Sequence, residues 1–118
     1  MDSLEKFLFC AKLAHDKKAK NLVILELKGV SALADYFIIC SGTSDRHVQA
    51  IASHVEISMK GKGTLALGTE GIQTGKWVLL DYDDVIIHVF QEKEREFYDI
   101  ESLWNECPRI PFLDAEEQ

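Results

Sequence analysis

The chain has 118 residues, a length that suits one domain with its own hydrophobic core. Its hydrophobic fraction of 47% is ordinary for a globular protein, and no segment reaches the roughly 20 apolar residues of a membrane-spanning helix. Thirteen Lys and Arg residues against twenty Asp and Glu residues give a net charge of -7. This charge opposes direct binding to DNA or to long stretches of RNA backbone, and it makes a basic protein the better-matched partner.

The N-terminus and the cysteines indicate the compartment. The opening residues, MDSLEKFLF, include an early acid and no basic region ahead of an apolar run, which is unlike a secretory signal. The cysteines are few and widely spaced, at Cys10, Cys40 and Cys107, with no C-x-x-C pair for zinc or redox chemistry. We therefore expect a cytoplasmic protein with reduced thiols, no metal site and no cofactor.

The first half of the chain predicts a helix, two strands and a second helix. From Asp2 to about Lys17 the apolar residues have helical spacing, and Asp2 and Glu5 occupy capping-box positions. Residues 21–27 and 36–40 are short apolar runs typical of buried strands. Thr43 or Ser44 is the expected N-cap of a helix that ends near Gly61. Its expected buried face consists of Val48, Ile51, Ala52, Val55 and Met59.

The second half predicts a hairpin followed by short helices. Residues 76–82 and 85–90 flank a tight acidic turn at Asp83-Asp84. Alternation places Trp77, Leu79 and Asp81 on one face of the first strand and Val78, Leu80 and Tyr82 on the other. In residues 92–104 the helical spacing of Phe97, Ile100, Leu103 and Trp104 predicts one or two helices that close the sheet.

Together these elements predict a single compact α/β domain over residues 1–107, with a mixed β-sheet of four to five strands and helices packed on it. Residues 108–118 contain two prolines and an acidic end, DAEEQ, and are expected to form an irregular C-terminal tail.

Two features of the sequence bear on possible chemistry. The turn from Ser41 to Arg46 joins a strand to a helix, but it lacks the spacing of a phosphate-binding loop, so helix capping and an ion pair of Arg46 are favoured. The histidines lack the spacing of metal ligands or of catalytic pairs. These histidines are His15, His47, His54 and His88.

Several motifs, in order, resemble the ribosomal silencing factors, also called the Iojap-like proteins. The motifs are Asp35-Tyr36-Phe37, the turn from Ser41 to Arg46, Trp77 with Asp81, Tyr82 and Asp84, His88-Val89-Phe90, and the segment from Arg95 to Trp104. The resemblance covers nearly everything from Leu4 to Trp104. One departure is Asp83, which occupies a turn position that is commonly Gly in the family.

The resemblance implies a nucleotidyltransferase-like topology, possible homodimers and a translational repressor. Such a repressor binds the large ribosomal subunit, chiefly through ribosomal protein L14, and sterically blocks association with the small subunit. The candidate partner-binding residues are Glu70, Gly71, Trp77, Asp81, Tyr82, Asp84, Tyr98, Leu103 and Trp104. A structural role stays open for each of them: a core position for the aromatic residues and Leu103, and turn formation for the others.

Two alternative functions stay open. Organellar relatives are linked to large-subunit biogenesis, so an assembly factor would use the same surface. A metal-dependent nucleotidyltransferase would need a Gly-Ser turn near a pair of acids, which Ser41-Gly42 and Asp81-Tyr82-Asp83 superficially supply. These pieces lie about forty residues apart in sequence, whereas that enzyme class usually separates them by about a dozen residues. The sequence therefore favours a protein that is not an enzyme.

Overall fold

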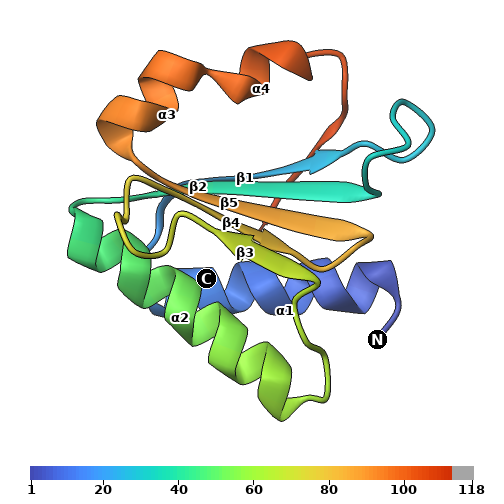
Figure 1. Ribbon diagram of the computed structural model, residues 1–118. Helices are drawn as coiled ribbons and strands as arrows, with labels where there is room; N and C mark the ends of the chain where they lie inside the picture. The colour runs from blue at the N-terminus through green and yellow to red at the C-terminus, as the bar shows by residue number, and fades with distance from the viewer. Residues whose placement is uncertain (113–118) are drawn as a thin grey trace.

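Three layers make up the computed structural model, which describes residues 1–112: a helical pair, a sheet and a second helical pair (Figure 1). The helices are α1 (Ser3–Asp16), α2 (Asp45–Gly61), α3 (Glu92–Tyr98) and α4 (Ile100–Leu103). The strands are β1 (Lys20–Glu26), β2 (Tyr36–Gly42), β3 (Gly68–Glu70), β4 (Trp77–Asp81), β5 (Val85–Gln91) and β6 (Arg109–Ile110). The predicted α/β class is confirmed.

The sheet has six strands in the order β3-β4-β5-β2-β1-β6. Only β2 and β5 pair in parallel among these strands, so the sheet is mixed, as predicted. The predicted count of four to five strands is too low because β3 and β6 are very short. Since β6 pairs Ile110 with Ile24 of β1, the prediction of an irregular tail is wrong for Arg109–Ile110. The predicted acidic end, residues 114–118, lies outside the described residues.

Both long helices begin at predicted caps. The Asp2 side chain accepts a hydrogen bond from the Glu5 backbone N–H at 2.9 Å, and Ser44 accepts one from the His47 backbone N–H at 3.0 Å. Each bond satisfies a backbone donor that the first helical turn leaves free. Helix α2 buries the five residues predicted for its inner face. Within residues 1–112, no helix is both long and apolar enough to cross a membrane.

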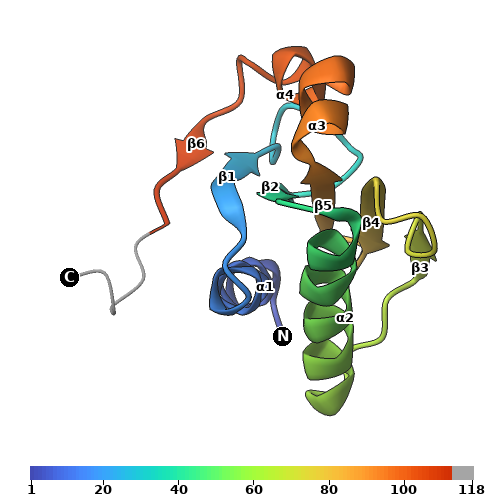
Figure 2. The ribbon, with the colours of Figure 1, turned by 90° about the vertical axis from the view of Figure 1, so that its left-hand side faces the viewer.

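Each face of the sheet has its own core. Helices α1 and α2 cover one face, where the largest buried side chains include Phe7, Ile51, Leu80 and Tyr82. Helices α3 and α4 lie over the other, where Leu25, Phe37, Ile39 and Phe90 are buried (Figure 2). The predicted alternation of β4 is confirmed, because Val78 and Leu80 are buried while Trp77, Leu79 and Asp81 are partly exposed. Cys10, Cys40 and Cys107 are buried and unbridged.

The C-terminal helices differ from the prediction. Asp99 has a φ of +43°, in the left-handed region, and it separates α3 from α4. The spacing of a single continuous helix therefore does not describe residues 92–104. Ile100 and Trp104 pack against the sheet, but Phe97 is 80% exposed and Leu103 is 71% exposed. The prediction that all four residues close the sheet is wrong for Phe97 and Leu103.

Candidate functional site

Trp77 is partly exposed at the start of β4, on the sheet face that α3 and α4 cover in part. Its indole stacks on Phe90, with ring centroids 4.7 Å apart and an interplanar angle of 26°. It also contacts Tyr98 at 4.9 Å, and its Nε1–H donates to Nδ1 of His88 at 3.1 Å. Three neighbours thus restrain a side chain that is still open to solvent. Trp77 is neither a fully buried core residue nor a freely rotating surface residue.

Around Trp77 lies an apolar surface with an acidic margin, which we call the Trp77 surface. It consists of Glu70, Gly71, Trp77, Leu79, Phe97 and Tyr98. The first four line a hollow of about 290 Å³. Phe97 is 80% exposed, Tyr98 is 51% exposed, and their rings meet edge to face at 5.0 Å. Adjacent exposed aromatic groups of this kind mark interaction sites more often than isolated apolar residues do.

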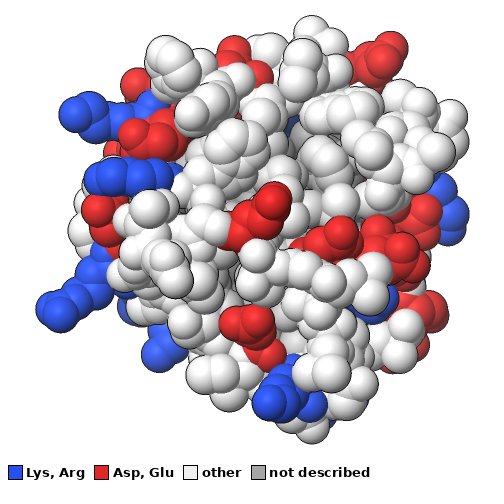
Figure 3. Space-filling model, viewed as in Figure 1, with Lys and Arg blue, Asp and Glu red and all other residues white. Residues whose placement is uncertain are grey.

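Figures 2 and 3 show why this region is open. Strands β4 and β3 project beyond α3 in Figure 2, so none of the helices within residues 1–112 lies above the outer part of the sheet on that face. Figure 3 looks toward the β3 edge, where most of the central surface is uncharged and the charged side chains nearest the centre are acidic. The incomplete cover leaves apolar side chains in contact with solvent.

The loop before Trp77 is tied to α2. Gln49 donates from Nε2 to the carbonyl oxygens of Ile72 and Gln73, at 2.9 and 3.0 Å. Gly71 has a φ of +80°, and a Cβ atom at this position would lie 2.0 Å from the Trp77 carbonyl oxygen. Glycine is thus required by both backbone conformation and space. These contacts fix the backbone from which Trp77 projects.

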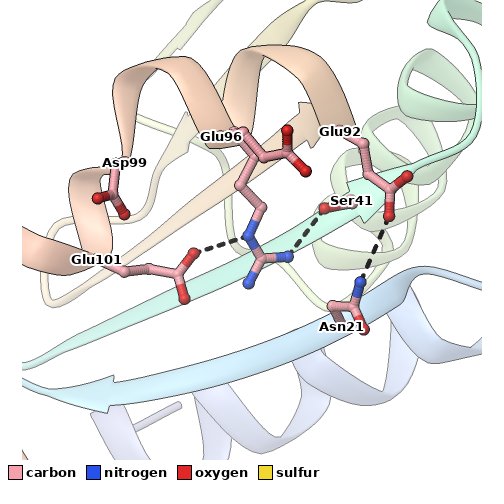
Figure 4. A pocket seen from close by; sticks show the side chains of 7 residues that line it. Asn21, Ser41, Glu92, Glu96, Asp99 and Glu101 are labelled. Carbon is pink, nitrogen blue, oxygen red and sulfur yellow. Dashed lines mark hydrogen bonds and ion pairs between the residues drawn. The ribbon is translucent and has the colours of Figure 1, made fainter.

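A partly buried ion pair positions α3 and α4 on the sheet. Arg95 donates from Nε to Glu101 at 2.8 Å and from Nη1 to the Ser41 hydroxyl at 2.9 Å (Figure 4). The guanidinium lies beside a polar hollow of about 310 Å³. The hollow is lined by Asn21, Ser41, Glu92, Arg95, Glu96, Asp99 and Glu101. Because Nε and Nη1 both donate within the protein, we interpret Arg95 as a structural link that places Tyr98 beside Trp77.

The three predicted residues of the hairpin turn have different environments. Tyr82 is 2% exposed and belongs to the core beneath α1 and α2, so the expectation that it contacts a partner is wrong for this structure. Asp84 is paired with Lys6 of α1 at 2.5 Å, which explains it as a link between the turn and the helix. Asp81 accepts the Asp83 N–H at 2.8 Å but stays partly exposed.

The turn keeps its shape without glycine. Asp83 has a φ of +74°, in the left-handed region that glycine occupies most easily. Asp tolerates this region better than most residues, and the bond from its N–H to Asp81 holds the turn.

The remaining predicted contacts separate into two groups. The Trp77 surface brings together Glu70, Gly71, Trp77 and Tyr98. Trp104 instead packs edge to face on Phe37, with centroids 5.9 Å apart, and Leu103 is exposed on α4. Leu79 and Phe97 were not selected from the sequence. Strand alternation could have indicated Leu79, because it places this residue on the same face as Trp77 and Asp81. The exposure of Phe97 could not be predicted in this way, because the helix breaks at Asp99 and the helical spacing of residues 92–104 is interrupted there.

The two pieces of a nucleotidyltransferase-like site do not meet. The sheet register aligns Asp81 with Ile86 of β5, and Ile86 with Phe37 of β2. Ser41 lies four residues further along β2, which corresponds to roughly 13 Å along the strands and about 10 Å across them. This separation gives no shared pocket for the two groups.

Comparisons with known proteins agree with one another. The family model described as ribosomal silencing factor during starvation matches residues 1–118. The ribosomal silencing factor of Halalkalibacterium halodurans is 38% identical over 110 residues, which are 93% of this chain and 94% of that protein. The ribosomal silencing factor of Bacillus subtilis is 41% identical over 98 residues, 83% of each chain.

More distant and structural relatives extend this result. The mouse protein named mitochondrial assembly of ribosomal large subunit protein 1 is 29% identical over 96 residues, 78% of this chain and 42% of that protein. A crystal structure of a protein from Chromobacterium violaceum has a TM-score of 0.87 and 32% identity, and the match covers 98% of this chain and 95% of that one. The match of the family model along the whole chain, together with these identities, shows that the chain belongs to the ribosomal silencing factor family.

Proposed function

We propose that this protein represses translation by binding the large ribosomal subunit, chiefly through ribosomal protein L14, and by blocking its association with the small subunit. The Trp77 surface is the proposed contact. The observation that carries this proposal is a restrained, partly exposed Trp beside the exposed Tyr98, whose ring in turn contacts the exposed Phe97.

The chemistry of the surface suits a protein partner. Binding hot spots are enriched in Trp and Tyr set among apolar neighbours that exclude water. The hollow beside Trp77 can receive a partner side chain, and Leu79 provides an apolar wall. Because the rings are already packed in the free protein, little conformational entropy would be lost on binding.

Charge supports a basic partner. The net charge is -7, and Glu70 and Asp81 lie next to the apolar residues of the surface. Acidic groups at the margin of an interface speed the encounter with a basic protein and disfavour nucleic-acid backbones.

Repression then requires no catalysis. A folded domain bound where the small subunit must dock makes the two binding events mutually exclusive. The apparent affinity of the subunits for each other falls by a factor of one plus the ratio of repressor concentration to its dissociation constant. Bacterial ribosomal subunits join in the cytoplasm, so the proposal places the protein there. Self-association through the same surface is a further proposal, which size-exclusion chromatography over a range of concentrations tests.

The experiment adds the purified protein to separated large and small subunits and measures the joined-ribosome peak in a sucrose gradient. We expect the peak to fall with concentration, and purified L14 to be retained on the immobilised protein. An unchanged peak at saturating concentration contradicts the proposal.

Two surface variants sharpen the test. Trp77→Ala is expected to weaken binding by about 2 kcal/mol or more, and Phe97→Ala by about 1 kcal/mol. Phe97 is 80% exposed, so its removal leaves the core intact. Ile57→Ala is the matched control, because Ile57 is 70% exposed on α2, which covers the opposite face of the sheet. Equal effects of Phe97→Ala and Ile57→Ala would place the contact elsewhere.

A role in assembly of the large subunit is the second candidate. It is favoured by the name of the mouse relative, mitochondrial assembly of ribosomal large subunit protein 1. An assembly factor is expected to bind precursor particles and to leave the joining of mature subunits unchanged. The same gradient, loaded with precursor and with mature particles, separates the two functions.

A further inference from the structure

His88 is a buried histidine whose ring faces Trp77. It is 5% exposed in β5, and Phe37 packs against its ring with centroids 4.8 Å apart. The Trp77 ring is 6.0 Å away, and the indole Nε1–H donates to the His88 Nδ1 at 3.1 Å. The imidazole therefore connects the inner core of this sheet face to the exposed aromatic group.

The hydrogen bond fixes the chemical state of the imidazole. Because Nδ1 accepts a hydrogen bond from the Trp77 indole N–H, the neutral ring carries its own hydrogen on Nε2. Burial lowers the pKa of His88 to about 4, so the ring is neutral near pH 7. A protonated ring would carry a hydrogen on both nitrogens and could not accept the indole N–H.

Stacking alone does not define the orientation of Trp77. A half-rotation of the indole about its χ2 bond would exchange the positions of its N–H edge and its benzene ring, so the N–H would point away from His88. The χ2 torsion of Trp is broad and roughly two-fold, so a directional contact is needed to select one orientation. Among the contacts of Trp77 described above, the hydrogen bond to His88 is the one that fixes the direction of the indole N–H.

We propose that His88 is a positioning residue that holds the indole of Trp77 in the single orientation competent to dock on the large-subunit protein. The inference rests on the proposed function, and it adds a residue that does not itself belong to the contact surface. His88 acts through Trp77, since its own side chain is almost fully buried.

The test compares two substitutions of His88. His88→Leu removes the acceptor while keeping an apolar side chain, whereas His88→Asn retains an acceptor oxygen near the position of Nδ1. We expect His88→Leu to weaken binding to mature large subunits by about threefold to tenfold, the range that one lost neutral hydrogen bond corresponds to. His88→Asn should bind within about twofold of the wild type.

A control separates positioning from stability. Val89→Ala removes fully buried apolar atoms from the next position of β5, on the opposite face of the sheet, without touching Trp77. We expect this variant to lose stability but to bind normally at a temperature where it stays folded. If Val89→Ala weakens binding as much as His88→Leu does, the effect of His88 is one of stability, and the inference is overturned.

A second readout follows the indole itself. Exchange of the Trp77 indole N–H with solvent, measured by NMR in the free protein, is expected to be slow in the wild type and in His88→Asn and fast in His88→Leu. Unchanged exchange in His88→Leu, or its normal binding while Trp77→Ala fails to bind, overturns the positioning role. A wild-type protein that does not bind large subunits instead overturns the proposed function, while the exchange rates still report whether His88 restrains Trp77.

Discussion

Substituting Gly71 tests how closely the loop and Trp77 are coupled. The residue has a φ of +80°, and an added Cβ atom would lie 2.0 Å from the Trp77 carbonyl oxygen. Gly63 has a nearly identical φ of +82° but no atom within 4 Å of the added Cβ, so it provides a matched control. Both alanine variants suffer the left-handed backbone strain, and only one of them also meets the backbone of Trp77.

The expected magnitudes differ accordingly. Gly63→Ala should cost about 1 kcal/mol of unfolding free energy, because an L residue is strained in the left-handed region. Gly71→Ala should cost about 2–3 kcal/mol, because the loop must also move away from Trp77 and lose about one backbone hydrogen bond. The bond most exposed to this movement is the one from the Gly75 N–H to the Gly71 carbonyl, at 3.0 Å.

Urea unfolding followed by circular dichroism measures both variants, and binding to large subunits is measured below the unfolding transition. We expect Gly71→Ala to bind more weakly than Gly63→Ala, since Trp77 is displaced only in the former. Equal unfolding free energies and equal binding would refute the argument that the backbone of Trp77 is fixed by its contact with Gly71.

Two further predictions concern buried polar groups. His88 has a folded pKa of about 4 against an ordinary value of 6.5, so stability present above pH 6.5 is lost as the pH falls toward 4. Urea unfolding at pH 7 and pH 5 should show the wild type losing about 2 kcal/mol more than His88→Asn, and an equal loss would contradict a neutral buried ring. Arg95→Met should cost about 2 kcal/mol, because the partly buried Glu101 then keeps only its longer pair with Arg109, at 3.7 Å. Lys76→Met, which removes an exposed pair with Asp45, should leave the unfolding free energy nearly unchanged in the same assay.

The long elements could be predicted from the sequence because their signals are local. The caps at Asp2 and Ser44 and the alternation of β4 depend on neighbours within four residues, and the structure has them as predicted. Strands β3 and β6 have three and two residues, which is too short for a periodic signal. Their formation depends on pairing with β4 and β1.

The candidate site could be predicted only in part, for a related reason. Tyr98 contacts Trp77 from a helix that is linked to the sheet by the bond of Arg95 to Ser41, 54 residues away in sequence, and no local pattern encodes that bond. Tyr82 shows the opposite case. Strand alternation separates Tyr82 from Trp77, and the structure follows the alternation, whereas the motif of the family contains both residues without distinguishing the two faces.

The division of the sheet into two faces explains how one small domain can be both stable and available for binding. Helices α1 and α2 bury one face of the sheet, which supplies most of the core and leaves few side chains there for a partner. The shorter helices α3 and α4 leave the outer part of the other face open, so Trp77 and Leu79 meet solvent on a rigid strand. Because the exposed groups are held by β4 and β5 and by a loop tied to α2, a partner would meet a surface that is already ordered. A binding surface of this kind gains affinity from the order that folding has established.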